Sequence, residues 1–113
     1  MMDNIIEIKS YDFAVKIIEV YQNIVKQKQE HVLSKQLLRC GTSIGANVAE
    51  AEKAQTKADF KAKMFIALKE ANETSYWLRL LNKTGYIDDE KFSTLFNDAD
   101  ELISILVAIT KKA

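Results

Sequence analysis

The chain has 113 residues, with 16 lysines and arginines balanced by 16 aspartates and glutamates, no proline, three glycines and one cysteine. This length predicts one domain with a single core, over residues 1–113. The neutral balance does not indicate an electrostatic grip on nucleic acid by the whole protein, and a lone cysteine excludes an intrachain disulfide.

Alanine, leucine, lysine and glutamate dominate the chain and favour helix almost everywhere, and the breaks between apolar stripes predict four helices. The first is expected over residues 10–28, with Ser10 as its N-cap. Its core face is predicted to carry Phe13, Ile17, Val20 and Ile24. The polar run 27–31 predicts a connection, and the second helix is expected over residues 32–54.

The third helix is expected over residues 57–84. Thr56, followed three residues later by Asp59, has the spacing of a capping box, and Gly85 lies where a helix-ending C′ residue is expected. Asp88 is positioned to cap a fourth helix over residues 88–112. Because short connections force successive helices to lie antiparallel, the predicted fold is an all-α, up-down-up-down antiparallel four-helix bundle.

The second helix carries a track of polar side chains beside its apolar stripe, within an arc of roughly 80°. The track consists of Gln36, Arg39, Ser43, Asn47 and Glu50. A track of this kind is half buried in a bundle, so its members need partners or a ligand. Glu50, Glu70 and Glu73 are available to pair with Arg39 and Arg79 across facing helices as structural salt bridges.

The third helix has more apolar side chains than one core stripe requires. Phe65 and Tyr76 lie on a second side of this helix, and Ile66 and Trp77 lie on a third. A monomeric bundle needs one apolar stripe per helix, so these four residues are predicted to lie at a subunit interface or a partner groove.

Catalysis and metal binding are poorly supported. His31, the sole histidine, falls in the polar connection, where a solvated side chain is expected. Cys40 lies on the apolar side of the second helix and is expected to be a buried filler rather than a nucleophile. The chain has no Glu-x-x-His pair for a di-iron site, and Gly41 and Gly45 are better explained by close helix packing than by a phosphate-binding loop. We therefore expect no enzymatic activity, no cofactor and no metal.

The charge is unevenly spread, because residues 26–69 hold nine lysines and arginines against four acids. Aligned helices would gather these cations into a basic face; the alternative is an ordinary solvated lysine surface. The predicted phosphate contacts are Lys53, Lys57, Lys61 and Lys63, with Arg39 contributing. Aromatic residues alternate with basic ones around 60–65 and 76–79, a pattern that serves base stacking but at helical spacing is more often part of a core.

The chain contains no run of eighteen apolar residues, and its first ten residues include an early acid and do not read as a signal peptide. We expect a cytoplasmic protein that makes no membrane contact. The lone cysteine fits a reducing compartment.

Two parts of the sequence carry a resemblance to a known family. They are Gln36–Arg39 with Ser43, Ile44 and Asn47–Glu50, and Ala67-x-x-Glu70-x-x-Glu73-x-x-Tyr76-Trp77-Leu78 followed by Gly85-Tyr86-Ile87. Over about residues 13–110 the chain resembles the small four-helix-bundle proteins of intervening sequences in bacterial 23S ribosomal RNA genes. The accessory protein of diversity-generating retroelements is similar and belongs to the same fold group.

The resemblance implies a homopentamer that binds structured RNA or DNA, with a reverse transcriptase or another protein as a further partner. The most recognisable family positions correspond to Arg39, Ser43, Asn47 and Glu50. Two departures stand out: Ala51 replaces the glycine that is common after the Asn-x-Ala-Glu motif, and the chain is neutral where nucleic-acid-binding members are basic.

Two functions therefore stay open. The leading one is a non-enzymatic, homo-oligomeric assembly or adaptor protein that engages structured nucleic acid through a basic face. The alternative is a protein–protein interaction module with no nucleic-acid role.

Overall fold

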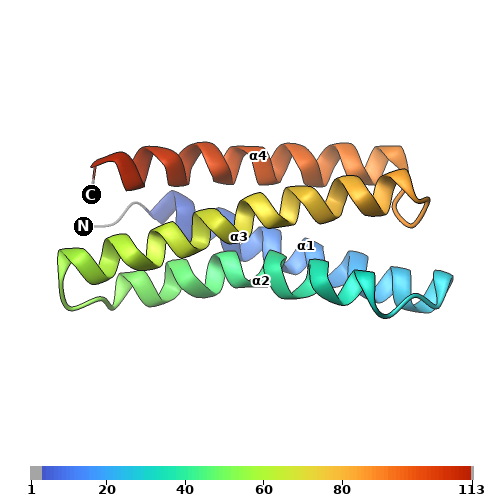
Figure 1. The fold of residues 1–113 in the computed structure, drawn as a ribbon, viewed down its shortest axis with the longest axis horizontal. Coiled ribbons are helices and arrows are strands. Elements are labelled where there is room, and N and C mark those ends of the chain that lie inside the picture. The colour runs from blue at the N-terminus through green and yellow to red at the C-terminus, as the bar shows by residue number, and fades with distance from the viewer. Residues whose placement is uncertain (1–3, 113) are drawn as a thin grey trace.

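The computed structural model describes residues 4–112, and over that range the chain folds into four α-helices with no strand (Figure 1). The helices are α1 (Asn4–Lys28), α2 (Leu33–Glu52), α3 (Lys57–Lys83) and α4 (Asp89–Lys112). The prediction of an all-α four-helix bundle is confirmed. Residues 1–3 and 113 of the single domain expected over 1–113 lie outside the described range.

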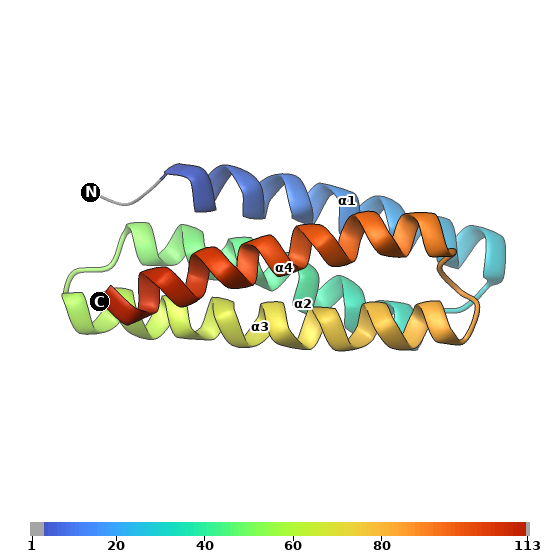
Figure 2. The ribbon, with the colours of Figure 1, turned by 90° about the horizontal axis from the view of Figure 1, so that it is seen from above.

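Successive helices run in alternating directions along a bundle that measures 44 × 20 × 18 Å (Figure 1). Helix α1 contacts α2 and α4, and α3 contacts the same two helices. Helices adjacent in the chain are therefore neighbours in space, and the bundle closes where α4 lies beside α1 (Figure 2). No helix within residues 4–112 is long and apolar enough to cross a membrane.

One apolar stripe from each helix meets in the core. Fully buried large side chains include Phe13 and Ile17 of α1, Leu37 and Ile44 of α2, Met64 and Leu78 of α3, and Leu95 and Leu102 of α4. Burying each of them contributes about 1.5–3 kcal/mol. The core is thus built from the stripes that the sequence pattern predicts.

The expected start of the first helix is wrong, because α1 begins six residues before Ser10. Ile6 is fully buried and belongs to the same stripe as Phe13, so burial extends the helix backward. Ser10 lies inside the helix, is buried, and donates its hydroxyl hydrogen to the Glu7 carbonyl oxygen at 3.2 Å. A serine that satisfies its hydroxyl in this way is tolerated within a helix instead of capping it.

Helices α1 and α2 approach closely at two glycines. A Cβ atom added to Gly41 would lie 2.9 Å from two side-chain carbons of Ile17, and one added to Gly45 would lie 3.2 Å from the Ser10 carbonyl oxygen. Both glycines therefore serve close helix packing, with the small Ser10 side chain opposite Gly45.

The start of α2 is capped by a residue that the sequence pattern did not indicate. The Glu30 carboxylate accepts hydrogen bonds from the backbone N–H groups of Val32, Leu33 and Ser34 at 2.9, 2.7 and 2.8 Å. Burial of the carboxylate opposes its ionisation, but these N–H donors outweigh that effect and lower the pKa of Glu30. Helix α2 ends at Glu52, two residues before the expected end.

The predicted capping residues of α3 and α4 are confirmed, and these helices begin and end within one residue of the expected positions. The Thr56 side chain accepts a hydrogen bond from the Asp59 N–H at 3.0 Å at the start of α3. At its end, Gly85 has φ +89°, and the N–H of Tyr86 donates to the Leu81 carbonyl oxygen at 2.9 Å in a Schellman arrangement. The Asp88 carboxylate accepts from the Lys91 N–H at 2.7 Å at the start of α4.

Candidate functional site

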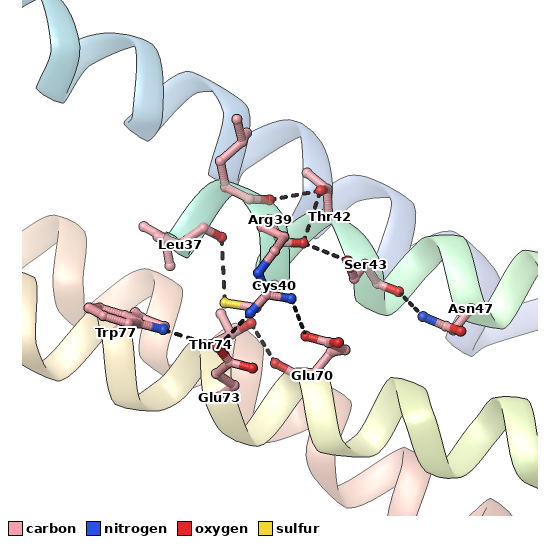
Figure 3. A network of polar contacts seen from close by, with 11 residues as sticks. Leu37, Arg39, Cys40, Thr42, Ser43, Asn47, Glu70, Glu73, Thr74 and Trp77 are labelled. Atoms are coloured by element: carbon pink, nitrogen blue, oxygen red, sulfur yellow. Dashed lines mark hydrogen bonds and ion pairs between the residues drawn. The ribbon is translucent and has the colours of Figure 1, made fainter. Parts of the chain in front are cut away.

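The polar track of α2 forms a line of polar and charged side chains, from which Arg39 reaches Glu70 and Glu73 of α3 while Ser43 and Asn47 bond along α2 (Figure 3). Arg39 donates to Glu70 Oε1 at 3.3 Å and to Glu73 Oε2 at 2.5 Å. Trp77 Nε1 donates to the same Glu73 oxygen at 3.3 Å. The hydrogen bond from Arg39 lowers the pKa of Glu73, against the opposing effect of burial. We call the line the α2–α3 seam; it comprises Arg39, Ser43, Asn47, Glu50, Lys63, Glu70 and Glu73.

The other seam residues bond within their own helix or across to α3. The Ser43 hydroxyl donates to the Arg39 carbonyl oxygen at 2.6 Å, and Asn47 Nδ2 donates to the Ser43 carbonyl oxygen at 2.8 Å. Glu50 pairs with Lys63 at 2.9 Å. Gln36, the remaining member of the predicted track, is exposed. Because these partners come from the chain itself, the seam can join α2 to α3 without a ligand.

The two reactive side chains that the sequence singles out, Cys40 and His31, lie in different surroundings. Cys40 is fully buried, and burial raises the pKa of its thiol, so the thiolate nucleophile is disfavoured. His31 is exposed in the connection between α1 and α2. Within the described residues 4–112, no group of three or more His, Cys, Asp or Glu side chains is arranged to hold a metal ion.

The five predicted phosphate contacts do not lie on one face. Arg39 and Lys63 are ion-paired within the seam. Lys61 lies roughly 160° around α3 from Lys63, and its Nζ is 5.9 Å from the centre of the Phe65 ring. Lys53 and Lys57 are exposed near the connection between α2 and α3. The structure therefore separates the basic residues that the sequence places close together.

The four predicted interface residues lie on two sides of α3. Phe65 and Tyr76 are 47% and 50% exposed, and the Arg79 guanidinium lies 6.0 Å from the Tyr76 ring centre. Ile66 is 40% exposed. Trp77 is half-buried, donates into the seam, and meets the Tyr76 ring edge-on with 5.3 Å between the ring centres. Phe65 and Tyr76 thus each stand beside a cation.

An exposed apolar stripe on α1 was missed by the sequence pattern. Ile8, Tyr11, Val15 and Ile18 are 59%, 71%, 43% and 40% exposed and lie within an arc of roughly 80° opposite the core. Their spacing of three and four residues is the signal that identifies them. Starting the helix at Ser10 left Ile8 off it and hid the pattern. We call these four residues the α1 stripe.

An open cleft of about 550 Å³ lies between the second half of α1 and the turn that joins α3 to α4. Its lining is mixed in charge, with Glu19, Asp88 and Asp89 beside Lys28 and Lys91. Val20, Ile24 and Ile87 supply its apolar part. The lining contains no serine, cysteine or histidine.

Comparison with known proteins matches residues 2–108 to the family described as 23S rRNA-intervening sequence protein. Among solved structures, the chain is similar to the crystal structure of a protein with unknown function from the S23 ribosomal protein family of Bacteroides thetaiotaomicron. The two chains are 52% identical and align with a TM-score of 0.92, covering 94% of this chain and 98% of the other. No curated protein matches. The seam and the α1 stripe both lie within the matched residues.

Proposed function

This chain belongs to the 23S rRNA-intervening sequence protein family, and from that premise we propose that it is a non-enzymatic assembly or adaptor protein that works as a homo-oligomer. The family assignment by itself names no activity, since the similar solved protein is of unknown function. The observation that carries the proposal is the α1 stripe.

The α1 stripe places four large apolar side chains in water along about 15 Å of helix. Contiguous apolar surface of this kind marks an interaction site more often than scattered single residues do. The lysines of this part of α1 point away from the stripe, because Lys9 and Lys16 reach α4 and pair with Glu101 and Asp98 at 3.2 and 2.8 Å. The exposed acids Glu7, Asp12 and Glu19 border the stripe on its two sides, which is the arrangement of an apolar contact surface with a polar rim.

A second copy of this chain is the partner that we propose for the α1 stripe. Most soluble oligomers are built from identical subunits with closed symmetry, which buries the same patch on every copy. The family resemblance implies a pentamer, and in a ring of that kind the α1 stripe of each subunit packs against a different surface of the next subunit. An assembly that presents several identical surfaces is suited to an adaptor role.

The test is the mass of the native protein, measured by native mass spectrometry and by light scattering after gel filtration. The wild type is expected at a multiple of 12.9 kDa, and the double variant Ile8→Ser, Val15→Ser at a lower multiple with unchanged helical circular dichroism. A matched control, Gln27→Ser, alters an exposed polar residue of α1 outside the arc of the stripe and is expected to leave the mass unchanged. A wild type that stays at 12.9 kDa at high concentration contradicts the proposal.

Binding of structured nucleic acid is a second candidate function, and the charge of α3 favours it. This helix carries six lysines and arginines against three acids, although the whole chain is neutral. Arg39 already occupies two of those acids, Glu70 and Glu73, which leaves a surplus of cations. An oligomer that repeats α3 in each subunit multiplies this local charge, which compensates for the neutral monomer.

A further inference from the structure

One side of α3 combines cations with aromatic rings. Its residues recur every three or four positions over about 33 Å of helix, within an arc of roughly 80° that points away from the core. We call this the outer face of α3; it comprises Lys61, Phe65, Lys69, Asn72, Tyr76, Arg79 and Lys83. Six of these residues are exposed and Lys61 is partly so. Four of the seven carry a positive charge, and none carries a negative one.

The cations and rings of the outer face lie side by side. Lys61 Nζ is 5.9 Å from the Phe65 ring centre, and the Arg79 guanidinium is 6.0 Å from that of Tyr76. Both distances are within the range of a cation–π interaction. Each half-exposed ring therefore has a positive charge next to it. In each pair the ring can stack on a nucleic-acid base while the cation contacts a neighbouring phosphate.

A groove extends the outer face at the C-terminal end of α3, close to the start of α4. It has a volume of about 340 Å³, and Tyr76, Arg79 and Lys83 of α3 face Phe92 of α4 across it. Leu80 and Asn82 complete the lining, which contains no acidic side chain. A flat, anionic ligand finds two rings and two cations within one small space there.

The charge of the outer face argues against the apolar α1 stripe of a second copy as its occupant. Packing this face against an apolar surface would desolvate four cations without supplying counter-charges. The nearest acid on the seam side, Glu73, is already held by Arg39. A polyanion supplies the missing charge along the whole length of the face.

We propose that the outer face of α3 binds single-stranded nucleic acid. Phosphates lie on Lys61, Lys69, Arg79 and Lys83, and unpaired bases stack on Phe65 and Tyr76. Stacking on side chains requires bases that are not already stacked in a duplex, so single strands and the loops of structured RNA are the substrates. The inference rests on the nucleic-acid candidate function above. It keeps Lys61 of the predicted contacts and replaces the other lysines at 53–63 with residues of this face.

The test is fluorescence anisotropy of a labelled twenty-nucleotide oligothymidine, titrated with the protein at several salt concentrations. Tyr76→Ala is expected to weaken binding about ten-fold by removing one stacking platform, and Tyr76→Phe to retain it. The double variant Lys69→Gln, Lys83→Gln is expected to weaken binding and to reduce the slope of log K against log salt by about 1.4. Its matched control, Lys35→Gln, Lys53→Gln, removes two exposed lysines elsewhere and is expected to keep that slope.

Several results overturn the inference. The wild type does not bind the oligothymidine at low salt, or the two double lysine variants weaken binding equally. Alternatively, the wild type binds the matching duplex as tightly as the single strand. A folded Tyr76→Ala protein with a lower native mass also overturns it, because the face is then a subunit contact. An oligomeric protein that does not bind the oligothymidine refutes this inference alone, whereas a monomer that binds it refutes the assembly proposal alone.

Discussion

Glu30 is a residue whose charge matters for the fold although it lies outside the helices. Its carboxylate receives the first free N–H groups of α2, the helix end where a negative charge is favourable. Val32 occupies the N-cap position and makes no side-chain cap bond. The start of α2 therefore depends on a side chain two residues before the usual capping position.

Glu30→Gln is expected to destabilise the protein by about 1 kcal/mol at pH 7, since it removes the charge of a helix cap. The pKa of Glu30 is lower in the folded state than its ordinary value of 4.5, so its contribution is present above pH 4.5. The contribution disappears as the pH falls through the folded pKa. Urea unfolding at pH 7 and at pH 3 should therefore show a smaller difference between wild type and variant at the lower pH.

Glu52→Gln is the matched control for this prediction. It removes an exposed carboxylate from the opposite end of α2, where the helix dipole disfavours negative charge, so stability is expected to stay the same or rise slightly. An equal loss in both variants would show that net charge, and not the cap, sets the stability.

At the scale of helices, the end of α1 contains an avoidable strain. Gln29 has φ 55°, a left-handed conformation that side chains other than glycine seldom adopt, and its N–H donates to the Val25 carbonyl oxygen at 3.1 Å. This position is the C′ site at which helices most often place glycine.

Gln29→Gly is expected to raise the free energy of unfolding by about 1 kcal/mol, because it relieves this conformation. Gln27→Gly, two residues earlier and inside the helix, is expected to lower it by a similar amount. Thermal unfolding followed by circular dichroism measures both changes. A midpoint that falls in both variants refutes the role assigned to Gln29.

Local signals made most of the fold predictable from the sequence, and non-local ones account for the errors. Thr56, Gly85 and Asp88 act on neighbouring backbone groups, so their roles follow from spacing alone. The early start of α1 depends on burial of Ile6 by other helices, which no local pattern at Ser10 reveals.

The candidate surfaces were less predictable, for a related reason. The pattern offered Glu50, Glu70 and Glu73 as partners of two arginines, and the rotation of α3 against α2 decides among them. That rotation gives Arg39 two glutamates, gives Glu50 to Lys63 and leaves Arg79 over a ring. Lys61 and Lys63 are two residues apart in the sequence but lie on different sides of α3.

For the whole molecule, the uneven distribution of charge and apolar surface matters more than the totals. The net charge is zero, yet α3 is positive and α4, its neighbour, has five acids against three lysines. The α1 stripe belongs to a different helix from the outer face of α3. Self-association and nucleic-acid binding are therefore proposed for separate parts of the same bundle.

If copies associate through the α1 stripe, stability depends on protein concentration, because association stabilises the folded state by mass action. The thermal midpoint of the wild type is expected to rise with concentration from 1 to 100 μM, and that of Ile8→Ser, Val15→Ser to rise less. Calorimetry or circular dichroism over this range provides the measurement. A wild-type midpoint independent of concentration would point to a monomer.

The position of Trp77 has a practical consequence. It is the only tryptophan in the chain, and its indole nitrogen donates to Glu73 while its ring meets Tyr76 edge-on. Glu73 belongs to the α2–α3 seam, and Tyr76 belongs to the outer face of α3. Indole emission responds to hydrogen bonding and to nearby rings, so the protein contains its own optical reporter. Loosening of the bundle and occupation of its surface can both be followed without a dye.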